Sequence, residues 1–363
     1  MVKLLHAADF HLDSPYRSLN AQQARQRRQE GRSNLLRLTQ FANAGDVDIV
    51  LLAGDLFDSG ELYRETMEML AKALGEIKGR VFIAPGNHDF WNPNGAYGKV
   101  QWPDNVHIFR RNAIEAVELP ELNCVVYGAA FTQNECNENL LKDFHAPEDG
   151  RIHIMVLHGD VDGGTRYNSF SHDEIAQSGL DYLALGHVHT FSGIQRTGNT
   201  AWAYPGCPEG RGFDECGEHG VIMGTVAKND VDLHFVGFGQ RRYEIITVDV
   251  TGRDVMEALS EALDKKHTET DIYRILFSGE TDVGGIDLSK IRDALESRFY
   301  QLELRDETRV AEDIWLRAKE DSLCGLFLRN LLRRKAEATT PEDFARIERA
   351  ARFGLAALEN RDL

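Results

Sequence analysis

Ile49-Val50-Leu51-Leu52-Ala53-Gly54-Asp55-Leu56-Phe57-Asp58 is the stretch from which the fold and the chemistry of this chain can be inferred. Residues 49–52 form an unbroken apolar run, which is typical of a strand buried on both faces of a sheet. Gly54 allows the backbone to turn sharply after that strand. Asp55 then presents a carboxylate at the strand's carboxyl end, where open α/β sheets bind their ligands and where a carboxylate can bridge metal ions. Alone, Gly-Asp after a strand is a common turn.

Four further clusters of metal-ligand residue types follow predicted strands. They are Asp9-Phe10-His11, Gly86-Asn87-His88-Asp89, His158-Gly159-Asp160 and Gly186-His187-Val188-His189. Within the first and last clusters, two ligand residues lie two positions apart, so their side chains can point the same way. A lone histidine at a strand end is more often structural, but five such clusters are hard to obtain by chance. A pair of divalent cations needs a bridging carboxylate with oxygen or imidazole ligands on each side, so the clusters predict a two-metal site.

The composition predicts a cytoplasmic protein. The 363 residues, 42% of them hydrophobic, suffice for one large domain and a smaller one. No apolar run reaches the roughly 18 residues needed to span a bilayer, and the chain begins directly with a predicted strand, without a signal peptide. The five cysteines are scattered and lack a Cys-x-x-Cys pair, which favours reduced thiols over disulfides or a zinc-thiolate site.

The formal net charge of −17 argues against a protein that coats nucleic acid by bulk electrostatics. It does not exclude an enzyme with a local basic groove. A carboxylate-rich metal site also inflates the formal count, because two bound dications would offset about four charges.

The pattern along the chain predicts an α/β fold. Residues 1 to about 90 alternate strands with helices, the first helix covering Ala21 to Ala44 and the second about Glu61 to Lys78. This alternation implies parallel βαβ units with right-handed crossovers. From about 105 to 240 the chain changes to short strands divided by polar and Gly-rich loops. We therefore expect two packed sheets with helices outside, an α/β/β/α sandwich.

Two further regions follow this predicted first domain, residues 1–240. Residues 241–305 have a β-α-β-α-β pattern and predict a small domain, which at about 60 residues would be marginal alone. Residues 306–363 are predicted to be helical. Within them, Thr340-Pro341-Glu342-Asp343 is a helix start, with a threonine cap, proline at the first position and acids in the first turn. These helices either pack on the main body or dock a partner.

Residues 4–190 resemble the calcineurin-like metallophosphoesterase family. The resemblance rests on five motifs that occur in this order: Asp-x-His, Gly-Asp-x-x-Asp, Gly-Asn-His-Asp, His-Gly and Gly-His-x-His. Residues 6–15 and 54–58 resemble more narrowly the family's DNA-repair nuclease branch, SbcD and its YhaO-like relatives. The small domain resembles that branch's capping domain. The helical tail resembles the region by which such nucleases grip an SMC-like ABC ATPase. The resemblance also implies DNA as a substrate and a homodimer.

The resemblance further implies a ligand set and a mechanism. One metal would take Asp9, His11, Asp55 and His189, and the other Asp55, Asn87, His158 and His187. A metal-bound hydroxide would attack phosphorus in line. His88 would protonate the leaving oxygen, and Asp58 would orient His88. The oxygen and nitrogen ligands suit Mn²⁺, with Mg²⁺, Fe or Zn²⁺ as alternatives.

Contacts to DNA are predicted from an arginine cluster just after the first ligand pair. It comprises Arg17, Arg25, Arg27, Arg28 and Arg32, of which we select Arg17, Arg25 and Arg28 as candidate DNA contacts. The alternative is a solvated helix face.

Three functions are compatible with these features. The first is a two-metal DNA exonuclease or endonuclease of a DNA-repair complex. The second is a phosphodiesterase or phosphatase of small nucleotide-type substrates, with a narrow pocket in place of a groove. The third is a non-catalytic DNA-binding regulator of an SMC-like ATPase. The full ligand set, together with His88, argues against the third.

Overall fold

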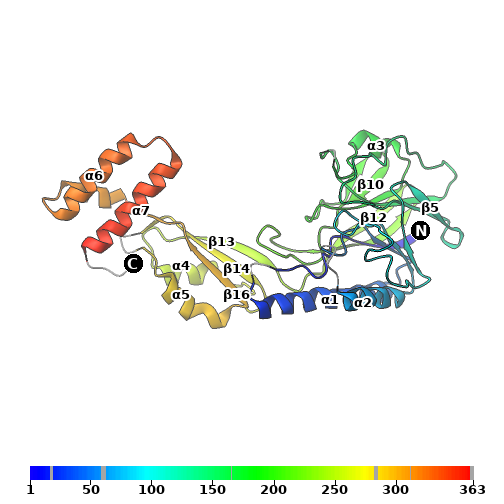
Figure 1. Cartoon of the computed structure of the whole chain (residues 1–363), viewed down its shortest axis with the longest axis horizontal. Helices are drawn as coiled ribbons and strands as arrows, with labels where there is room; N and C mark the ends of the chain where they lie inside the picture. The colour runs from blue at the N-terminus through cyan, green and yellow to red at the C-terminus, as the bar shows by residue number, and fades with distance from the viewer. Residues whose placement is uncertain (17–18, 59–62, 165, 282–284, 311, 360–363) are drawn as a thin grey trace. The chain divides into compact units, whose positions relative to one another are not determined.

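The computed structural model describes residues 1–16, 19–58, 63–164, 166–281, 285–310 and 312–359. The chain forms two compact units (Figure 1). Unit 1 comprises Met1–Arg211 and Gly217–Gln240, and unit 2 comprises Gly212–Cys216 and Arg241–Leu363. The chain thus leaves unit 1 after Arg211, contributes the short segment Gly212–Cys216 to unit 2, and returns to unit 1 at Gly217. The division of unit 2 into a capping domain and a helical docking domain stays a prediction.

The first sheet of unit 1 has six strands in the order β12-β11-β1-β2-β3-β4. Its strands are β1 (Val2–Ala7), β2 (Ile49–Leu52), β3 (Arg80–Ile83), β4 (Val106–Ile108), β11 (Gly220–Ala227) and β12 (Asp230–Gly237). β1, β2 and β3 are parallel, as predicted from the strand–helix alternation, and β4 also runs parallel, beside β3. β11 and β12 extend the sheet antiparallel beside β1.

Two helices cover the outer face of this sheet (Figure 1). They are α1 (Ala21–Ala44) and α2 (Arg64–Gly75). The bounds of α1 match the prediction, because Asn20 and Gln23 form a capping box at its start. α2 is shorter than the predicted span of 61–78, and its first predicted residues, 61–62, lie outside the described part of the chain.

The second sheet has the order β5-β6-β7-β8-β10-β9. Its strands are β5 (Glu115–Leu119), β6 (Cys124–Gly128), β7 (Ile152–His158), β8 (Tyr182–Gly186), β9 (Gln195–Thr197) and β10 (Thr200–Ala203). β6, β7, β8 and β10 are parallel to one another. The short helix α3 (His172–Gln177) lies outside this sheet, and its Ile175 joins the outer core.

Alternating side chains of the strands divide the core of unit 1 into three layers. Leu4, Leu51 and Ile154 belong to the layer between the two sheets. Their neighbours in sequence point outward, towards α1 and α2 from the first sheet and towards α3 from the second. Since strands with both faces covered need apolar residues at every position, this arrangement explains the continuous apolar runs. The predicted α/β/β/α sandwich is confirmed.

Unit 2 contains a small parallel sheet in the order β13-β14-β16. The strands are β13 (Tyr243–Asp249), β14 (Ile272–Ser278) and β16 (Gln301–Asp306), and the helices between them are α4 (Val255–Ala262) and α5 (Leu288–Leu295). A short 3₁₀ turn, Glu296–Arg298, extends α5. Val248, Ile275 and Leu304 pack under the two helices as one core. The predicted β-α-β-α-β order is confirmed.

The last part of unit 2 is not purely helical, in contrast to the prediction. Strand β17 (Arg309–Val310) pairs with β15 (Glu280–Thr281) before a 3₁₀ segment, Glu312–Lys319. A pair of two-residue strands has no periodicity that a sequence pattern could reveal. Helices α6 (Leu323–Glu337) and α7 (Pro341–Leu358) follow and pack on one another (Figure 1).

The predicted start of α7 is confirmed, because the Thr340 side chain accepts a hydrogen bond from the backbone N–H of Asp343. Within the described residues, no helix combines the length and the apolar character that crossing a bilayer requires.

Candidate metal centre

The predicted ligand residues follow the carboxyl ends of parallel strands in both sheets. Asp9 and His11 follow β1, Asp55 follows β2, and Asn87 follows β3, while His158 ends β7 and His187 and His189 follow β8. The carboxyl ends of parallel strands share one edge of a sheet. The contacts below show that the two sheets bring these edges together, so residues from opposite halves of the sandwich meet at one place.

Asp55 lies at the middle of this place. Its Oδ2 atom is 3.4 Å from Nε2 of His158 and 3.8 Å from Nε2 of His11. These two histidines come from different sheets, and neither they nor Asp55 is more than 2% exposed. The Oδ1 atom of Asp55 accepts the backbone N–H of His88 at 2.9 Å. One carboxylate oxygen therefore faces imidazoles from both sides of the site, a position that suits a bridging ligand.

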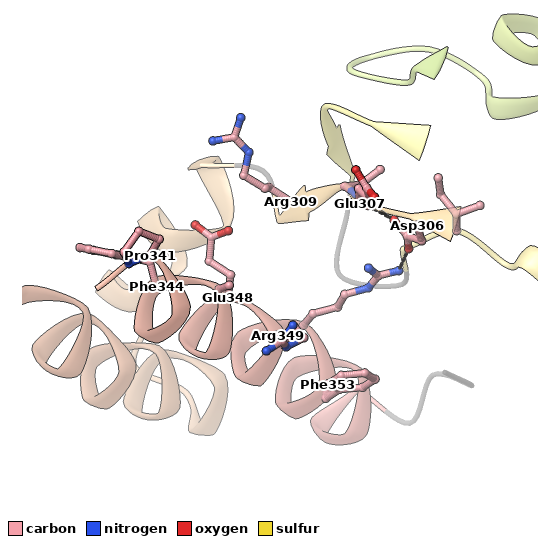
Figure 2. Close-up of a pocket in the computed structure, with 12 residues that line it drawn as sticks. Asp306, Glu307, Arg309, Pro341, Phe344, Glu348, Arg349 and Phe353 are labelled. Atoms are coloured by element: carbon pink, nitrogen blue, oxygen red, sulfur yellow. Dashed lines mark hydrogen bonds and ion pairs between the residues drawn. The ribbon is translucent and has the colours of Figure 1, made fainter. Parts of the chain in front are cut away.

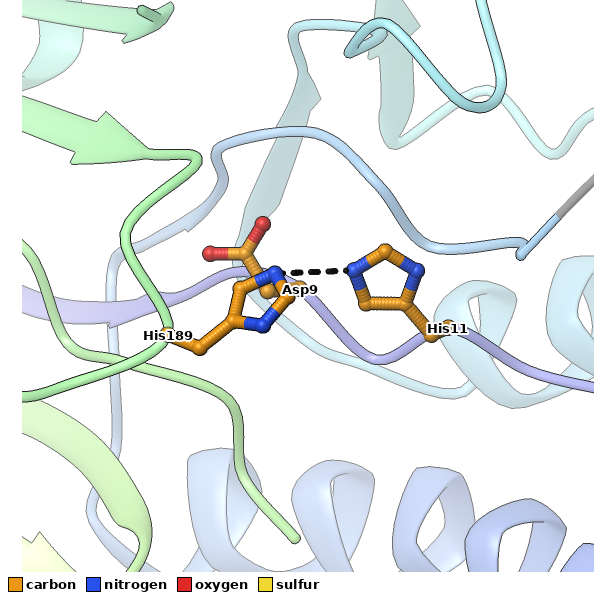
Figure 3. A group of neighbouring side chains, drawn as sticks. All are labelled: Asp9, His11 and His189. Carbon is orange, nitrogen blue, oxygen red and sulfur yellow. Dashed lines mark hydrogen bonds between the residues drawn. The ribbon is translucent and has the colours of Figure 1, made fainter. Parts of the chain in front are cut away.

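Among the described residues, three groups of potential ligand atoms lie at this place, and the third consists of His11, Asp58 and His88. The first two match the predicted ligand set. In the first, the Nε2 atoms of His11 and His189 are 3.2 Å apart, and Asp9 completes the group (Figure 3). In the second, Asp9 and Asp55 lie with His158, whose Nε2 is also 2.9 Å from Oδ1 of Asn87. Ligands at right angles and about 2.1 Å from one cation lie about 3 Å apart, so both groups fit a divalent cation.

His187 is held on two sides beside the second group. Its backbone N–H donates to the Asp9 carboxylate at 3.1 Å, and its Nε2 lies 3.7 Å from Oδ2 of Asp160. The ring of Tyr167 lies 4.8 Å from the His187 ring. Since Nε2 faces Asp160, Nδ1 is the nitrogen that His187 would offer to a cation, and Asp160 would orient the ring.

His88 is exposed and lies beside the first group, with its ring 5.0 Å from that of His11. Its Nδ1 is 2.9 Å from the backbone carbonyl oxygen of Asp58. Asp58 thus contacts His88 through its backbone, and its predicted role in orienting His88 stays a prediction. The Asp58 carboxylate instead lies 3.2 Å from Nδ1 of His11.

Sequence reasoning missed the role of Asp89. Its buried carboxylate accepts backbone N–H groups from Gly86 and Leu56 at 2.8 Å and from Asp55 at 3.2 Å, and it also accepts the hydroxyl of Tyr97. Asp89 therefore ties the loop after β3 to the loop that carries Asp55. The sequence carries no signal for this role, because the burial of Asp89 and its distant backbone partners become visible only in the folded chain.

The arginine cluster has mixed roles. Arg27 is completely buried and pairs with Glu209 at 2.8 Å, and Arg32 pairs with Asp13 at 2.8 Å, so both serve the structure. Arg25 is exposed and Arg28 is half-buried, and both stay predicted DNA contacts. Arg17 lies outside the described residues. Sequence reasoning also missed Arg211, which contacts both Asp58 and His189.

Burial and charge set the protonation of the imidazoles in different ways. Burial lowers the pKa of His11 to about 4 and that of His187 to about 4. Burial acts in the same direction on His158, but the charge and hydrogen bond of Asp55, with the charge of Asp9 and the Ala53 carbonyl, together outweigh it and raise the pKa of His158 to about 9. Burial raises the pKa of Asp9 to about 6. At pH 7, two imidazoles are thus neutral and His158 carries a proton.

We expect the binding of a divalent cation here to release a proton. His158 must lose its proton to bind a cation, so the affinity should rise with pH up to about 9, by about tenfold per pH unit. Below about pH 6 the slope should steepen, because Asp9 also takes up a proton. Titration calorimetry with Mn²⁺ in two buffers of different ionisation enthalpy measures the release. Equal apparent enthalpies in both buffers at pH 7.5 would contradict this prediction.

Replacing Asp89 by Ala should weaken both the fold and the metal centre. It would leave several buried N–H groups without an acceptor, at a cost of about 3 kcal/mol or more in the free energy of unfolding. The loop that carries Asp55 would also lose its anchor, so we expect the affinity for Mn²⁺ to fall by about tenfold or more. Urea denaturation and metal titration measure the two effects. Asp104→Ala, at an exposed aspartate, is the control and should change neither.

Comparison with known proteins agrees with this geometry. The chain is 28% identical to the uncharacterized metallophosphoesterase YhaO of Bacillus subtilis, over 96% of both chains. It is 22% identical to the DNA double-strand break repair protein Mre11 of Methanopyrus kandleri, over 86% of this chain and 72% of that protein. It is 24% identical to a subunit of the nuclease SbcCD of Staphylococcus epidermidis, over 52% of this chain and 57% of that protein.

The family model of the calcineurin-like phosphoesterases matches residues 2–191, more than half of the chain. The matched region runs from β1 to just past His189 and includes all seven predicted ligand residues. With its ligand groups gathered around Asp55, this chain belongs to the calcineurin-like metallophosphoesterase family.

Proposed function

We propose that this protein is a two-metal-dependent DNA nuclease of a DNA-repair complex. The observation that carries the proposal is the position of Asp55, whose single Oδ2 atom faces imidazoles from both sheets. Such a shared carboxylate is what a pair of cations needs. The exposed His88 beside it provides a group for proton transfer to a substrate.

The ligand residues divide between two cations. Asp9, His11, Asp55 and His189 would hold one, and Asp55, Asn87, His158 and His187 the other. When bound, the cations supply a water of lowered pKa and neutralise charge on the phosphoryl oxygens. The oxygen and nitrogen donors include no thiolate, so we propose Mn²⁺, with Mg²⁺, Fe or Zn²⁺ as alternatives.

His88 is positioned for the leaving group. The carbonyl of Asp58 accepts from Nδ1, which fixes the proton there and leaves Nε2 as the nitrogen that can act on a substrate. Protonated Nε2 would then donate to the oxygen that leaves phosphorus. Asp58 acts twice in this arrangement, with its carbonyl on His88 and its carboxylate on His11.

DNA is proposed as the substrate on the strength of the relatives. Two proteins that match this chain are named for DNA repair or nuclease activity, and the match to the Mre11 protein extends over 86% of the chain. The matched length exceeds the length of unit 1, so the likeness includes part of unit 2. Arg25 and Arg28 on α1 are the proposed phosphate contacts of this chain.

Cleavage of end-labelled linear duplex DNA by metal-stripped protein with added Mn²⁺ tests the proposal. We expect cleavage by the wild type and a loss of about 100-fold in His88→Ala, because a general acid contributes at least that much. The metal content of the variant should be unchanged. His234→Ala, at an exposed histidine of β12, is the matched control.

A small chromogenic phosphodiester with a nitrophenyl leaving group, tested in the same experiment, separates hydrolysis at phosphorus from protonation of the leaving group. Its nitrophenolate leaves without a proton, so His88→Ala should retain most of this activity. Hydrolysis of the chromogenic diester without any cleavage of DNA, alone or with an ATPase partner, would refute DNA as the substrate. It would favour the small nucleotide-type substrates instead.

We further propose that the hairpin of α6 and α7 docks an SMC-like ABC ATPase. Leu323 and Leu326 are 65% and 59% exposed and line a groove of about 410 Å³ with Leu358. On its other side, α7 and the turn before β17 enclose a cavity of about 930 Å³, where Phe344 and Phe353 lie among charged side chains (Figure 2). Exposed apolar side chains on both sides of a hairpin are typical of a protein interface.

Leu326→Glu should abolish co-purification with a co-expressed SMC-like ATPase, because it places a charge in the apolar groove. The fold should be unaffected, since the side chain is exposed. Leu36→Glu, at a 46% exposed leucine of α1, is the control and should bind normally. Normal binding by Leu326→Glu would exclude this groove as the docking surface.

A further inference from the structure

Arg211 reaches into the metal centre from the loop after β10. Its two terminal nitrogens lie 3.0 Å from Nδ1 of His189 and 3.2 Å from Oδ1 of Asp58. The side chain is 19% exposed, so it borders both the ligand residues and the solvent. The proposed mechanism assigns no role to the positively charged guanidinium of Arg211.

The loop behind Arg211 is fixed by buried contacts. Arg27 of α1 donates to the carbonyl oxygen of Gly210 at 2.8 Å and pairs with Glu209 at 2.8 Å. The other carboxylate oxygen of Glu209 accepts from the Asn34 side chain at 3.2 Å and from the backbone N–H of Gln240 at 2.6 Å. Because its neighbours are anchored in this way, the guanidinium of Arg211 is held in place before any substrate arrives.

The contact with His189 is incompatible with metal ligation by that ring. A guanidinium has only donors, so Nδ1 of His189 must be an acceptor in this contact. A neutral imidazole that gives Nε2 to a cation keeps its proton on Nδ1 and cannot accept there. With a cation on Nε2, the terminal nitrogen of Arg211 that faces His189 must therefore turn to another acceptor.

The surroundings indicate which acceptor this is. Three carboxylates, of Asp9, Asp55 and Asp58, lie around the place where a phosphodiester would bind, and they would repel its negative charge. A guanidinium matches the oxygens of phosphate in shape and charge and can bind two of them at once. We propose that Arg211 binds the non-bridging oxygens of the substrate phosphate at this centre. This inference rests on the proposed phosphoester hydrolysis but not on DNA as the substrate.

Inorganic phosphate is the probe for this role. We expect Arg211→Gln in Mn²⁺-loaded protein to weaken phosphate binding, measured by titration calorimetry, by about tenfold or more, which is the value of a charge-assisted hydrogen bond. The phosphate affinity of Arg211→Lys should lie between those of the wild type and Arg211→Gln, because lysine keeps the charge but cannot bind two oxygens at once as a guanidinium does. The affinity for Mn²⁺, measured by electron paramagnetic resonance, should not fall in either variant, because the contact of Arg211 with His189 is one that ligation must break. Arg64→Gln, at an 87% exposed arginine of α2, is the matched control.

The outcomes separate the roles of Arg211. Unchanged phosphate binding in Arg211→Gln would overturn the proposal. A parallel loss of Mn²⁺ affinity would also overturn it, because Arg211 would then position His189 instead of binding substrate. The expected loss of phosphate affinity in a protein that hydrolyses the chromogenic diester but never DNA would support Arg211 while refuting the nuclease function.

Discussion

The carboxylate of Asp55 is the group on which this site depends. His11 reaches it from the first sheet and His158 from the second, and its other oxygen holds the backbone of His88. Three segments that are far apart in sequence therefore converge on one side chain. A buried carboxylate is costly unless it is paired, so the surrounding imidazoles stabilise it and it raises the pKa of His158 in turn. The sandwich serves mainly to bring these partners to one edge.

Much of this arrangement could be predicted because ligand residues follow strands, and strands with apolar runs are easy to recognise. The order of strands and helices up to β3, the bounds of α1 and the gathering of the strand-end clusters all follow from local patterns. Asp89 and Arg211 could not be found in this way. Asp89 acts on backbone groups more than 30 residues away, and Arg211 belongs to a loop without periodicity. Contacts of this kind depend on tertiary structure alone.

Arg27 is an instructive intermediate case. It stands in an arginine-rich stretch that suggests a basic surface, yet it is the one member of Arg25, Arg27 and Arg28 that is fully buried. The helical period offers the reason, since Arg27 lies three positions after Ala24 and continues towards Leu35 and Leu38 on the buried face of α1. The local cluster of arginines predicted a DNA contact, whereas the position of Arg27 on the helix predicted burial in the core. Position was the better guide, and it led to the network behind Arg211.

The backbone of the ligand loops shows why the site can be ready before a cation binds. Asp9, His11 and Asp55 all have positive φ angles, which cost a non-glycine residue about 1 kcal/mol or more each. Hydrogen bonds between the two loops hold this conformation, from Asp9 N–H to the Gly54 carbonyl at 3.0 Å and from His11 N–H to the Asp55 carbonyl at 2.9 Å. Gly54 is needed there, because a Cβ atom would lie 2.6 Å from the His158 ring. Backbone hydrogen bonds that continue past the ends of β1 and β2 thus offset the strain. Asp9, His11 and Asp55 are therefore oriented for a cation before it binds.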